Sequence, residues 1–462
     1  MRVWPSFSSL CASAFFAAGV GAEEPAAHRL TLAEAAAHAL EHNPRTETAT
    51  SVRALADAKV GVAKSDAVPN LAVVGQVNRS TGNVVPGATF GMAGLPGIQG
   101  PPGTTRSGSG TWQSIAGVTL SWDVLELARR PVIVGAAEKD VETARAQADL
   151  TRVVVVADTA DLYLRVVAAD AVVTAAEAST ERLKTFRDVA ATLVGNKLRP
   201  DIDLARAETE LSAARVAVEK ARLGSVVARV ALAESIGETS WAIETVAADF
   251  SAMPPAVASS NAEHPAVLAY EDAAAAATAR ASVAKLARLP KVELAGAAWL
   301  RGGGYVLGGP NSGVANGLLP DTPNWAVGVV ATWTPGQILT AGARAEVEGR
   351  DASVNRARAD EVRSQLSADK AIAHATVTTA VAVAKETAAA VLQARRAVDL
   401  ATVRYTTGNG NVVEVADAER ARVAADRDAA VARIDVWRAF VAVCRAEGNM
   451  DPVLGGLGKA KG

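Results

Sequence analysis

The stretch Val62-Ala-Lys-Ser-Asp-Ala-Val-Pro-Asn-Leu-Ala-Val-Val-Gly75 decides the fold, because the chain repeats it as Val283-Ala-Lys-Leu-Ala-Arg-Leu-Pro-Lys-Val-Glu-Leu-Ala-Gly296. The two copies lie 221 residues apart, and Pro44 and Pro265 keep the same spacing. A repeat of this length indicates that a whole structural half is duplicated, since solenoid units are far shorter.

Further matches extend the repeat along each half. The offset is 211 residues for the block that pairs Gly117, Val118 and Trp122 with Gly328, Val329 and Trp333. It is 213 residues for the block that pairs Gly195 and Ala205 with Gly408 and Ala418. We therefore expect a variable loop between the first two blocks and a nearly constant length after them, with Gly195 and Gly408 as hairpin-turn glycines.

Each half contains two stretches in which apolar and polar side chains alternate, which is the period of a β-strand with one apolar face. The pattern is clearest where Leu71, Val73 and Val77 alternate with Ala72, Gln76 and Asn78. We expect strands at about 69–81, 112–122, 290–301 and 324–334. Runs of about ten residues suffice for tilted membrane strands, although a soluble two-layer sheet would show the same alternation.

Segments rich in glycine and proline, 82–111 and 302–323, join the two strands of each half and are typical of surface loops. Long loops fit the outward side of a membrane barrel, and tryptophans fit its two interfaces with water. The predicted anchors are Trp112, Trp299 and Trp325 near the loops, and Trp122 and Trp333 near the other end. Four strands cannot close a membrane barrel, since about eight are needed. The chain must therefore oligomerise, or it forms no barrel.

After the strands come two long segments without an internal proline, from about 131 to 194 and from about 338 to 406. Roughly 65 helical residues would reach about 100 Å, a length that implies a coiled-coil rod or tube. Each is followed by a turn and a second helix, at about 201–236 and 411–447. We therefore expect two long helical hairpins, at 131–236 and 338–447.

The amino terminus has the features of a signal peptide over residues 1–22: Arg2, an apolar stretch and a Val20-Gly-Ala22 end. Cys11 would leave with it, and Cys444 would then have no partner for an intrachain disulfide. No second stretch approaches the apolar length that a membrane helix needs, so we expect any membrane crossing to use strands. A formal net charge of −2 gives no electrostatic footprint for nucleic acid.

These boundaries divide the chain into five parts. The predicted parts are the signal peptide at 1–22, a first repeat at 23–240, a linker at 241–261, a second repeat at 262–450 and a tail at 451–462. No catalytic motif, cofactor motif or paired-cysteine metal spacing occurs in the sequence. His374 lies in an alanine-rich helical segment, where a packed or solvated role is favoured over a catalytic one. The sequence therefore predicts neither an enzyme nor a metal protein.

Three stretches of the chain have a recognisable pattern: Leu30-Thr-Leu-Ala-Glu-Ala35, His42-Asn-Pro44, and Tyr405-Thr-Thr-Gly408 through Glu414-Val-Ala-Asp417-Ala418. In these stretches the chain resembles the TolC-like outer membrane efflux proteins. The resemblance implies an α+β membrane protein whose homotrimer forms one twelve-stranded outer-membrane β-barrel, surrounded by lipid, and a periplasmic coiled-coil tunnel. It also implies a passive exit duct for a tripartite efflux pump or type I secretion system, opened when a periplasmic adaptor and an inner-membrane pump of the RND, ABC or MFS type dock at the tunnel tip.

The resemblance further implies a periplasmic gate at the two hairpin turns. Asp201 and Glu414 each lie six residues after a turn glycine, Tyr405 and Asp417 match gate residues of the second hairpin, and Asp203 joins them by position. Three copies would gather carboxylates around one axis and attract cations. Alternatively, Asp201 and Glu414 stabilise helix amino termini. Two residues depart from the family pattern: Gly410 stands where family members often carry a polar or basic gate partner, and Pro200 makes the first turn unusual.

A rival class would explain the helices without a pore. A periplasmic adaptor or structural protein also uses long coiled-coil hairpins, but it would leave the four alternating strands and their glycine-rich loops unexplained. Recovery in the outer-membrane fraction separates the two hypotheses, since the rival predicts a soluble periplasmic pool.

Overall fold

The computed structural model describes residues 28–65, 68–81, 108, 110–238, 242–246, 250, 252–255, 262–303 and 317–455. The predicted signal peptide at 1–22, with Cys11, lies outside these residues. Most of the two predicted loops, much of the linker at 241–261 and most of the tail at 451–462 also lie outside them.

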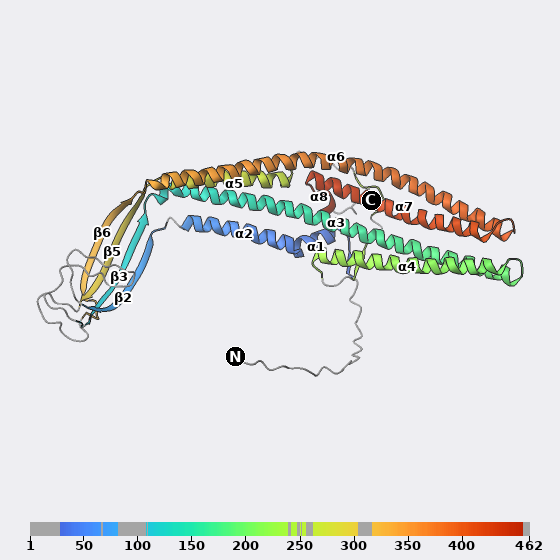
Figure 1. Ribbon diagram of the computed structural model, residues 1–462, viewed down its shortest axis with the longest axis horizontal. Helices are drawn as coiled ribbons and strands as arrows, with labels where there is room; N and C mark the ends of the chain where they lie inside the picture. Colours follow the sequence, from blue (N-terminus) through green and yellow to red (C-terminus); the bar gives the residue numbers. More distant parts are fainter. Residues whose placement is uncertain are drawn as a thin grey trace, which may run out of the picture. The chain divides into compact units, whose positions relative to one another are not determined.

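The described residues form the same series of elements in both halves (Figure 1). The first half contains α2 (Pro44–Ser65), β2 (Asn70–Thr81), β3 (Gly110–Asp123), α3 (Glu126–Gly195) and α4 (Asp201–Ile236). The second contains α5 (Pro265–Leu286), β5 (Lys291–Gly303), β6 (Thr322–Thr332), α6 (Gly336–Thr406) and α7 (Val412–Glu447). Corresponding helices have 22 and 22, 70 and 71, and 36 and 36 residues, so the predicted duplication is confirmed.

The four predicted strands are all present, with ends within about two residues of the expected positions. The long helices begin earlier than expected. Helix α3 starts at Glu126 and contains Pro131, because Asp123 accepts a hydrogen bond from the Leu125 amide and pairs with Arg129 at 3.2 Å. These contacts fix the first turn ahead of the proline.

The four strands form one antiparallel sheet in the order β2-β3-β5-β6. Leu71 pairs with Leu120, Leu120 with Gly296, and Gly296 with Val327, so the alternation of each strand stays in phase across the sheet. In the described part of the chain, β2 and β6 are edge strands with no further strand beside them.

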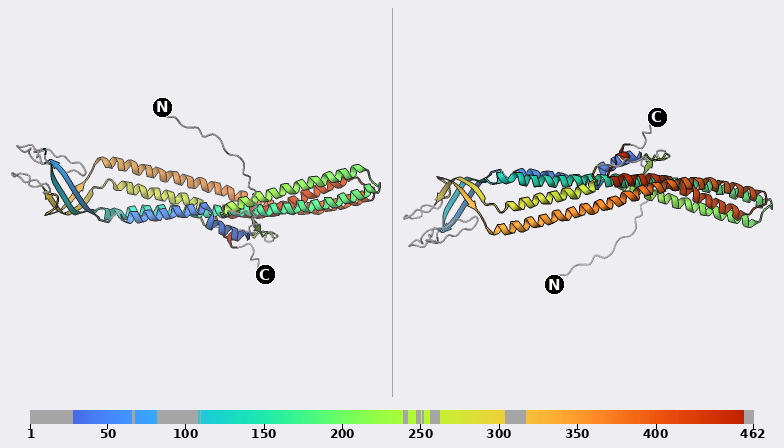
Figure 2. Two further views of the ribbon diagram at one scale, coloured as in Figure 1. Left: turned by 90° about the horizontal axis from the view of Figure 1, so that it is seen from below. Right: turned by 90° about the horizontal axis from the view of Figure 1, so that it is seen from above.

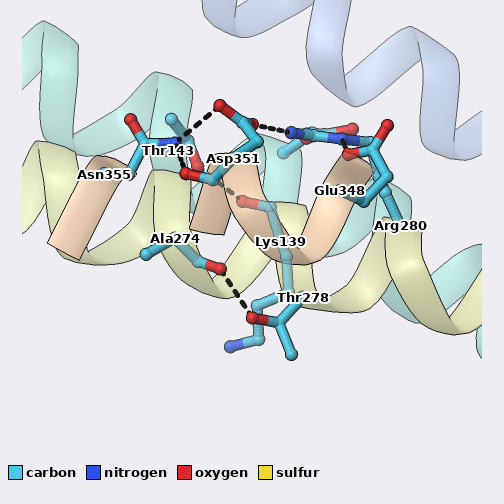
Figure 3. A network of polar contacts seen from close by, with 9 residues as sticks. Lys139, Thr143, Ala274, Thr278, Arg280, Glu348, Asp351 and Asn355 are labelled. Atoms are coloured by element: carbon cyan, nitrogen blue, oxygen red, sulfur yellow. Dashed lines mark hydrogen bonds and ion pairs between the residues drawn. The ribbon is translucent and has the colours of Figure 1, made fainter. Parts of the chain in front are cut away.

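The chain divides into two compact units, and each draws on both repeats because α3 and α6 contribute to both. One unit, Pro44–Val153 and Ser259–Ala371, contains the sheet, α2, α5 and the first parts of α3 and α6. Its helices are joined by Arg280 of α5, which pairs with Glu348 and Asp351 of α6 at 3.0 and 3.3 Å (Figure 3). The same guanidinium pairs with Asp140 of α3 at 2.7 Å. One guanidinium thus connects three helices.

The other unit contains the remaining parts of α3 and α6 with α4 and α7, which form two helical hairpins (Figure 2). It also contains β1 (His28–Leu30), α1 (Leu32–His42), β4 (Ile243–Thr245) and α8 (Asp451–Leu454). The buried Tyr163 hydroxyl of α3 donates to the Leu30 carbonyl and accepts from the Val246 amide, both at 2.8 Å. It therefore ties the parallel β1–β4 pair to the helices.

One helix in the described chain meets the length and composition of a membrane span. Helix α6 contains an 18-residue window with a mean hydropathy of 1.3, none of it buried. The expectation that no second stretch would reach this level was wrong, because alanine and valine raise the mean hydropathy of α6 between its widely spaced charges. The observation rests on length and composition alone.

Candidate functional site

The turns that end the α3–α4 and α6–α7 hairpins lie in the same compact unit. In the second turn Gly408 has a φ of 84°, and in the first turn Lys197 has a φ of 57°. In each turn the amide of the following residue donates to the carbonyl five residues before it at 2.9 Å. Both helices therefore end in a Schellman motif, although only the second uses the expected glycine.

Gly195 was predicted to be the matching turn glycine, but it is the last helical residue of α3. Equivalent features of the two hairpins are 211 residues apart: the left-handed residues Lys197 and Gly408, the first residues of α4 and α7, and the caps Gly237 and Gly448. The 213-residue offset inferred for this block was therefore wrong by two residues. Glu414 corresponds by position to Asp203, and not to Asp201.

Tyr405 and Asp203 meet between the hairpins. The Tyr405 hydroxyl donates to Asp203 Oδ2 at 3.4 Å, and the two residues are 0% and 7% exposed. The Tyr405 ring lies 5.5 Å from that of Phe186, in an apolar cluster with Val412 and Val415. Burial raises the pKa of the Tyr405 hydroxyl, and the Asp203 carboxylate raises it further. Tyr405 is therefore a neutral hydrogen-bond donor at neutral pH.

Arg199 lies in the first turn and contacts the second turn through its guanidinium group. One guanidinium nitrogen donates to the Tyr405 carbonyl at 2.5 Å and to the Gly410 carbonyl at 3.0 Å. The guanidinium carbon also lies 4.6 Å from the centre of the Tyr405 ring, which is a cation–π geometry. Arg199, Tyr405 and Asp203 together form a clamp between the two hairpins of one chain, and we call them the turn clamp.

The sequence prediction did not include Arg199. It lies 211 residues before Gly410, so the two occupy equivalent positions in the duplicated hairpins. The departure noted at Gly410, where a basic or polar residue was expected, was the available signal. The cation is supplied by the equivalent position of the other turn.

The remaining predicted acids lie outside this clamp. Asp201 is exposed and makes no hydrogen bond or ion pair to the described residues. Glu414 lies 3.5 Å from Arg404 of the same hairpin. Asp417 is exposed and lies 3.1 Å from Arg420, which also pairs with Glu210 of α4. Of the five predicted gate residues, the structure thus brings Tyr405 and Asp203 into contact with each other.

Asp201 and Glu414 lie at helix amino termini but do not cap them. Neither Asp201 nor Glu414 is a cap residue, since α4 follows Pro200 and α7 follows Asn411, whose side chain accepts from the Glu414 amide at 2.9 Å. Both acids do lie in the first turn of their helix, where the dipole favours a negative charge.

The sheet has an apolar and a polar face, which follow directly from the strand register. The apolar face carries Leu71, Val73, Val77, Trp112, Val118, Leu120, Trp122, Leu294, Leu300, Trp325, Val327 and Val329. The polar face carries Asn70, Gln76, Asn78, Gln113, Thr119, Ser121, Asp123, Glu293, Trp299, Arg301 and Asn324. Trp112, Trp122 and Trp325 therefore share one face, as membrane anchors require.

Two of the predicted anchors differ from these. Trp299 lies on the polar face, because it pairs directly with Gly117 and Asn324, and this position does not fit an interface anchor. Trp333 follows β6, is 58% exposed, and donates from its indole nitrogen to the Arg288 carbonyl at 3.2 Å. At the other end of the sheet, Arg79 lies 5.6 Å from the ring of Trp112, a pairing suited to a membrane–water interface.

Among the residues that the structure describes, no group of three histidine, cysteine or acidic side chains is placed to hold a metal ion.

Comparison with known proteins gives two findings. Residues 35–238 match the family model described as outer membrane efflux protein. No protein of curated function matches the sequence.

The fold is similar to that of several solved outer-membrane channels, each of which aligns with 90% of this chain. CmeC of Campylobacter jejuni has a TM-score of 0.70 at 16% identity over 85% of its own chain. VceC of Vibrio cholerae has a TM-score of 0.69 at 17% identity over 96%. MtrE of Neisseria gonorrhoeae, solved in an open state, has a TM-score of 0.68 at 18% identity over 89%. The expected fold class is confirmed.

Proposed function

We propose how this chain works on the premise that residues 35–238 match the family model of outer membrane efflux proteins and that 90% of the chain has the fold of solved outer-membrane channels. It is an outer-membrane channel, not an enzyme, and serves as the exit duct of a tripartite efflux pump or type I secretion system. Cargo passes through it from the periplasm to the outside without chemical change.

The membrane part is the four-stranded sheet. Its apolar face includes Val73, Trp325 and Val327, with exposures of 84%, 80% and 70%, as expected for side chains that contact lipid. Its two free edges need partners inside a membrane, where unpaired backbone groups are costly. Three chains would pair these edges and supply twelve strands, with the polar face lining the pore. The exposed apolar window of α6 would be covered by the neighbouring chains.

The gate is the turn clamp with the acids around it. While Arg199 and Asp203 hold Tyr405, the two hairpins of each chain stay together at the periplasmic end. Three copies of Asp201, Glu414 and Asp417 would surround the entrance with negative charge and concentrate cations there. Opening requires that the hairpins separate, and the contacts of Tyr405 would then break.

The partners are proposed from the same arrangement. A periplasmic adaptor and an inner-membrane pump of the RND, ABC or MFS type would dock on the hairpin turns, where Lys197 and Leu198 are exposed, the latter to 68%. Docking energy at this surface would offset the loss of the clamp contacts, which couples pump assembly to opening.

The function is tested by fractionation and by electrical recording. The protein should be recovered from outer membranes, migrate differently in detergent gels before and after heating, and carry ion current in planar bilayers. A soluble periplasmic pool without current would favour the coiled-coil adaptor instead.

The gate is tested by removing its charges. Asp201→Ala combined with Glu414→Ala should weaken current block by a trivalent cation applied from the periplasmic side, because the exposed carboxylates that attract it are lost. Asp203→Ala should raise the current itself, since it releases Tyr405. Wild-type block and wild-type current in these variants would show that the gate is elsewhere.

A further inference from the structure

Trp299 is the one tryptophan on the polar face of the described sheet, and it is the largest side chain there. The residue opposite it on β3 is Gly117, where an added Cβ would lie 2.5 Å from the Cβ of Trp299. Any side chain at position 117 would therefore collide with it. Glycine at position 117 therefore leaves room for the Trp299 side chain on the polar face.

The two layers of the polar face next to Trp299, on the side away from the loops, consist of short side chains on β3, β5 and β6. Ala297 pairs with Thr119 and Ala326, and Ala295 pairs with Ser121 and Gly328. Trp299 is half-buried, so part of its indole stays accessible beside a wall of short side chains.

Arg301 lies two residues further along the same face of β5, opposite Ile115 and Thr322. It is exposed and forms no ion pair with the described residues. Alternate residues of a strand are about 6.8 Å apart, so each chain presents an aromatic surface and a free positive charge at that separation. This spacing fits a planar aromatic ring that carries an anionic group.

We infer that Trp299 and Arg301 form a binding band for planar aromatic anions on the inner wall of the pore. The inference rests on the proposed function, because the polar face becomes the pore wall only in a closed barrel. The indole would stack on the ring of the solute, as aromatic side chains do with flat bases. The guanidinium would bind the anionic group. Three copies would make the band a selective step near the outer end of the duct.

The position of the band is tested by thiol labelling. The predicted signal peptide removes Cys11, and Cys444 is buried with a pKa raised to about 12, so the background reaction is slow. In the membrane-embedded protein, Trp299→Cys and Arg301→Cys should react with a charged, membrane-impermeant thiol reagent. Trp325→Cys, on the apolar face, is the matched control and should not react. Equal protection of all three would place Trp299 outside the pore and overturn the inference.

Binding is tested by current block in planar bilayers with 2-naphthalenesulfonate added on the outer side. Trp299→Ala should weaken block about tenfold, the effect of losing one stacking contact, and Arg301→Gln should weaken block by the sulfonate but not by uncharged 2-naphthol. Trp325→Ala should leave both unchanged. If the wild-type protein conducts and the block is equally strong in all variants, the inference is overturned and the proposed function stands. If the wild-type protein carries no current, the proposed function itself is refuted.

Discussion

Replacing Arg199 by alanine removes one of the two residues of the first hairpin that contact Tyr405 in the turn clamp. The lost contacts are two hydrogen bonds from a charged donor, at 2.5 and 3.0 Å, and the cation–π contact with Tyr405. Charged hydrogen bonds contribute about 1.5–3 kcal/mol each when buried, and a cation–π contact about 0.5–1 kcal/mol. Because Arg199 is half-exposed, we take about 3 kcal/mol for the sum, which corresponds to roughly a hundredfold shift toward separated hairpins.

The assay is single-channel recording in planar bilayers, with the fraction of time in high-conductance states as the readout. Arg199→Ala should increase this fraction by up to about a hundredfold, and Arg199→Lys should give an intermediate value because lysine keeps the charge but loses the planar fork. Lys197→Gln is the matched control, since it removes one positive charge from the same turn without touching the clamp. If Arg199→Ala and Lys197→Gln behave alike, the clamp does not hold the entrance closed.

Three further predictions concern titratable groups. The raised pKa of Tyr405 favours its neutral form, so the stability that Tyr405 contributes should be lost as pH rises above 10. Amide hydrogen exchange in the hairpins should therefore increase at alkaline pH, and Tyr405→Phe should remove that increase. Burial and then Glu142 raise the pKa of Asp272, so ionised Asp272 costs stability. Asp272→Asn should raise the Tm at pH 7, and the gain should shrink toward pH 4. Cys444 should react with a neutral aromatic disulfide reagent only after denaturation; reaction in the native protein would contradict its burial.

Much of the fold was predictable from local sequence pattern. Alternation located all four strands, since side chains of a half-exposed sheet must alternate in polarity. The sequence Thr31-Leu-Ala-Glu34 also has the pattern of a capping box, and the structure contains one: the Thr31 side chain accepts from the Glu34 amide, and the Glu34 carboxylate accepts from the Thr31 amide. These features depend on neighbours within a few residues, so one sequence is enough to find them.

The position of Trp299 was also contained in the sequence. In the predicted strand at 290–301, Val292, Leu294 and Leu300 alternate with Lys291, Glu293 and Arg301, so an odd-numbered residue of this strand must lie on the polar face. The prediction grouped the tryptophans by their distance from the loops and did not ask which face of the strand each one occupies. Following the alternation along each strand would have placed Trp299 and Trp325 on opposite faces.

The turn geometry and the clamp could not be predicted in this way. Matching Gly195 to Gly408 followed residue identity, but backbone capping is what defines the turn, and Lys197 adopts a left-handed conformation that a lysine rarely takes. Arg199 and Tyr405 are 206 residues apart. Their contact depends on which hairpins pack together, and no local pattern contains that information.

The most direct test of the account is the number of chains in the native particle. Native mass spectrometry of the protein extracted from outer membranes in mild detergent counts them without assuming a gate or a cargo. The account predicts three chains, because only further copies can pair the free edges of β2 and β6 in a membrane. A stable monomer in the same preparation would contradict the barrel, and with it the exit duct.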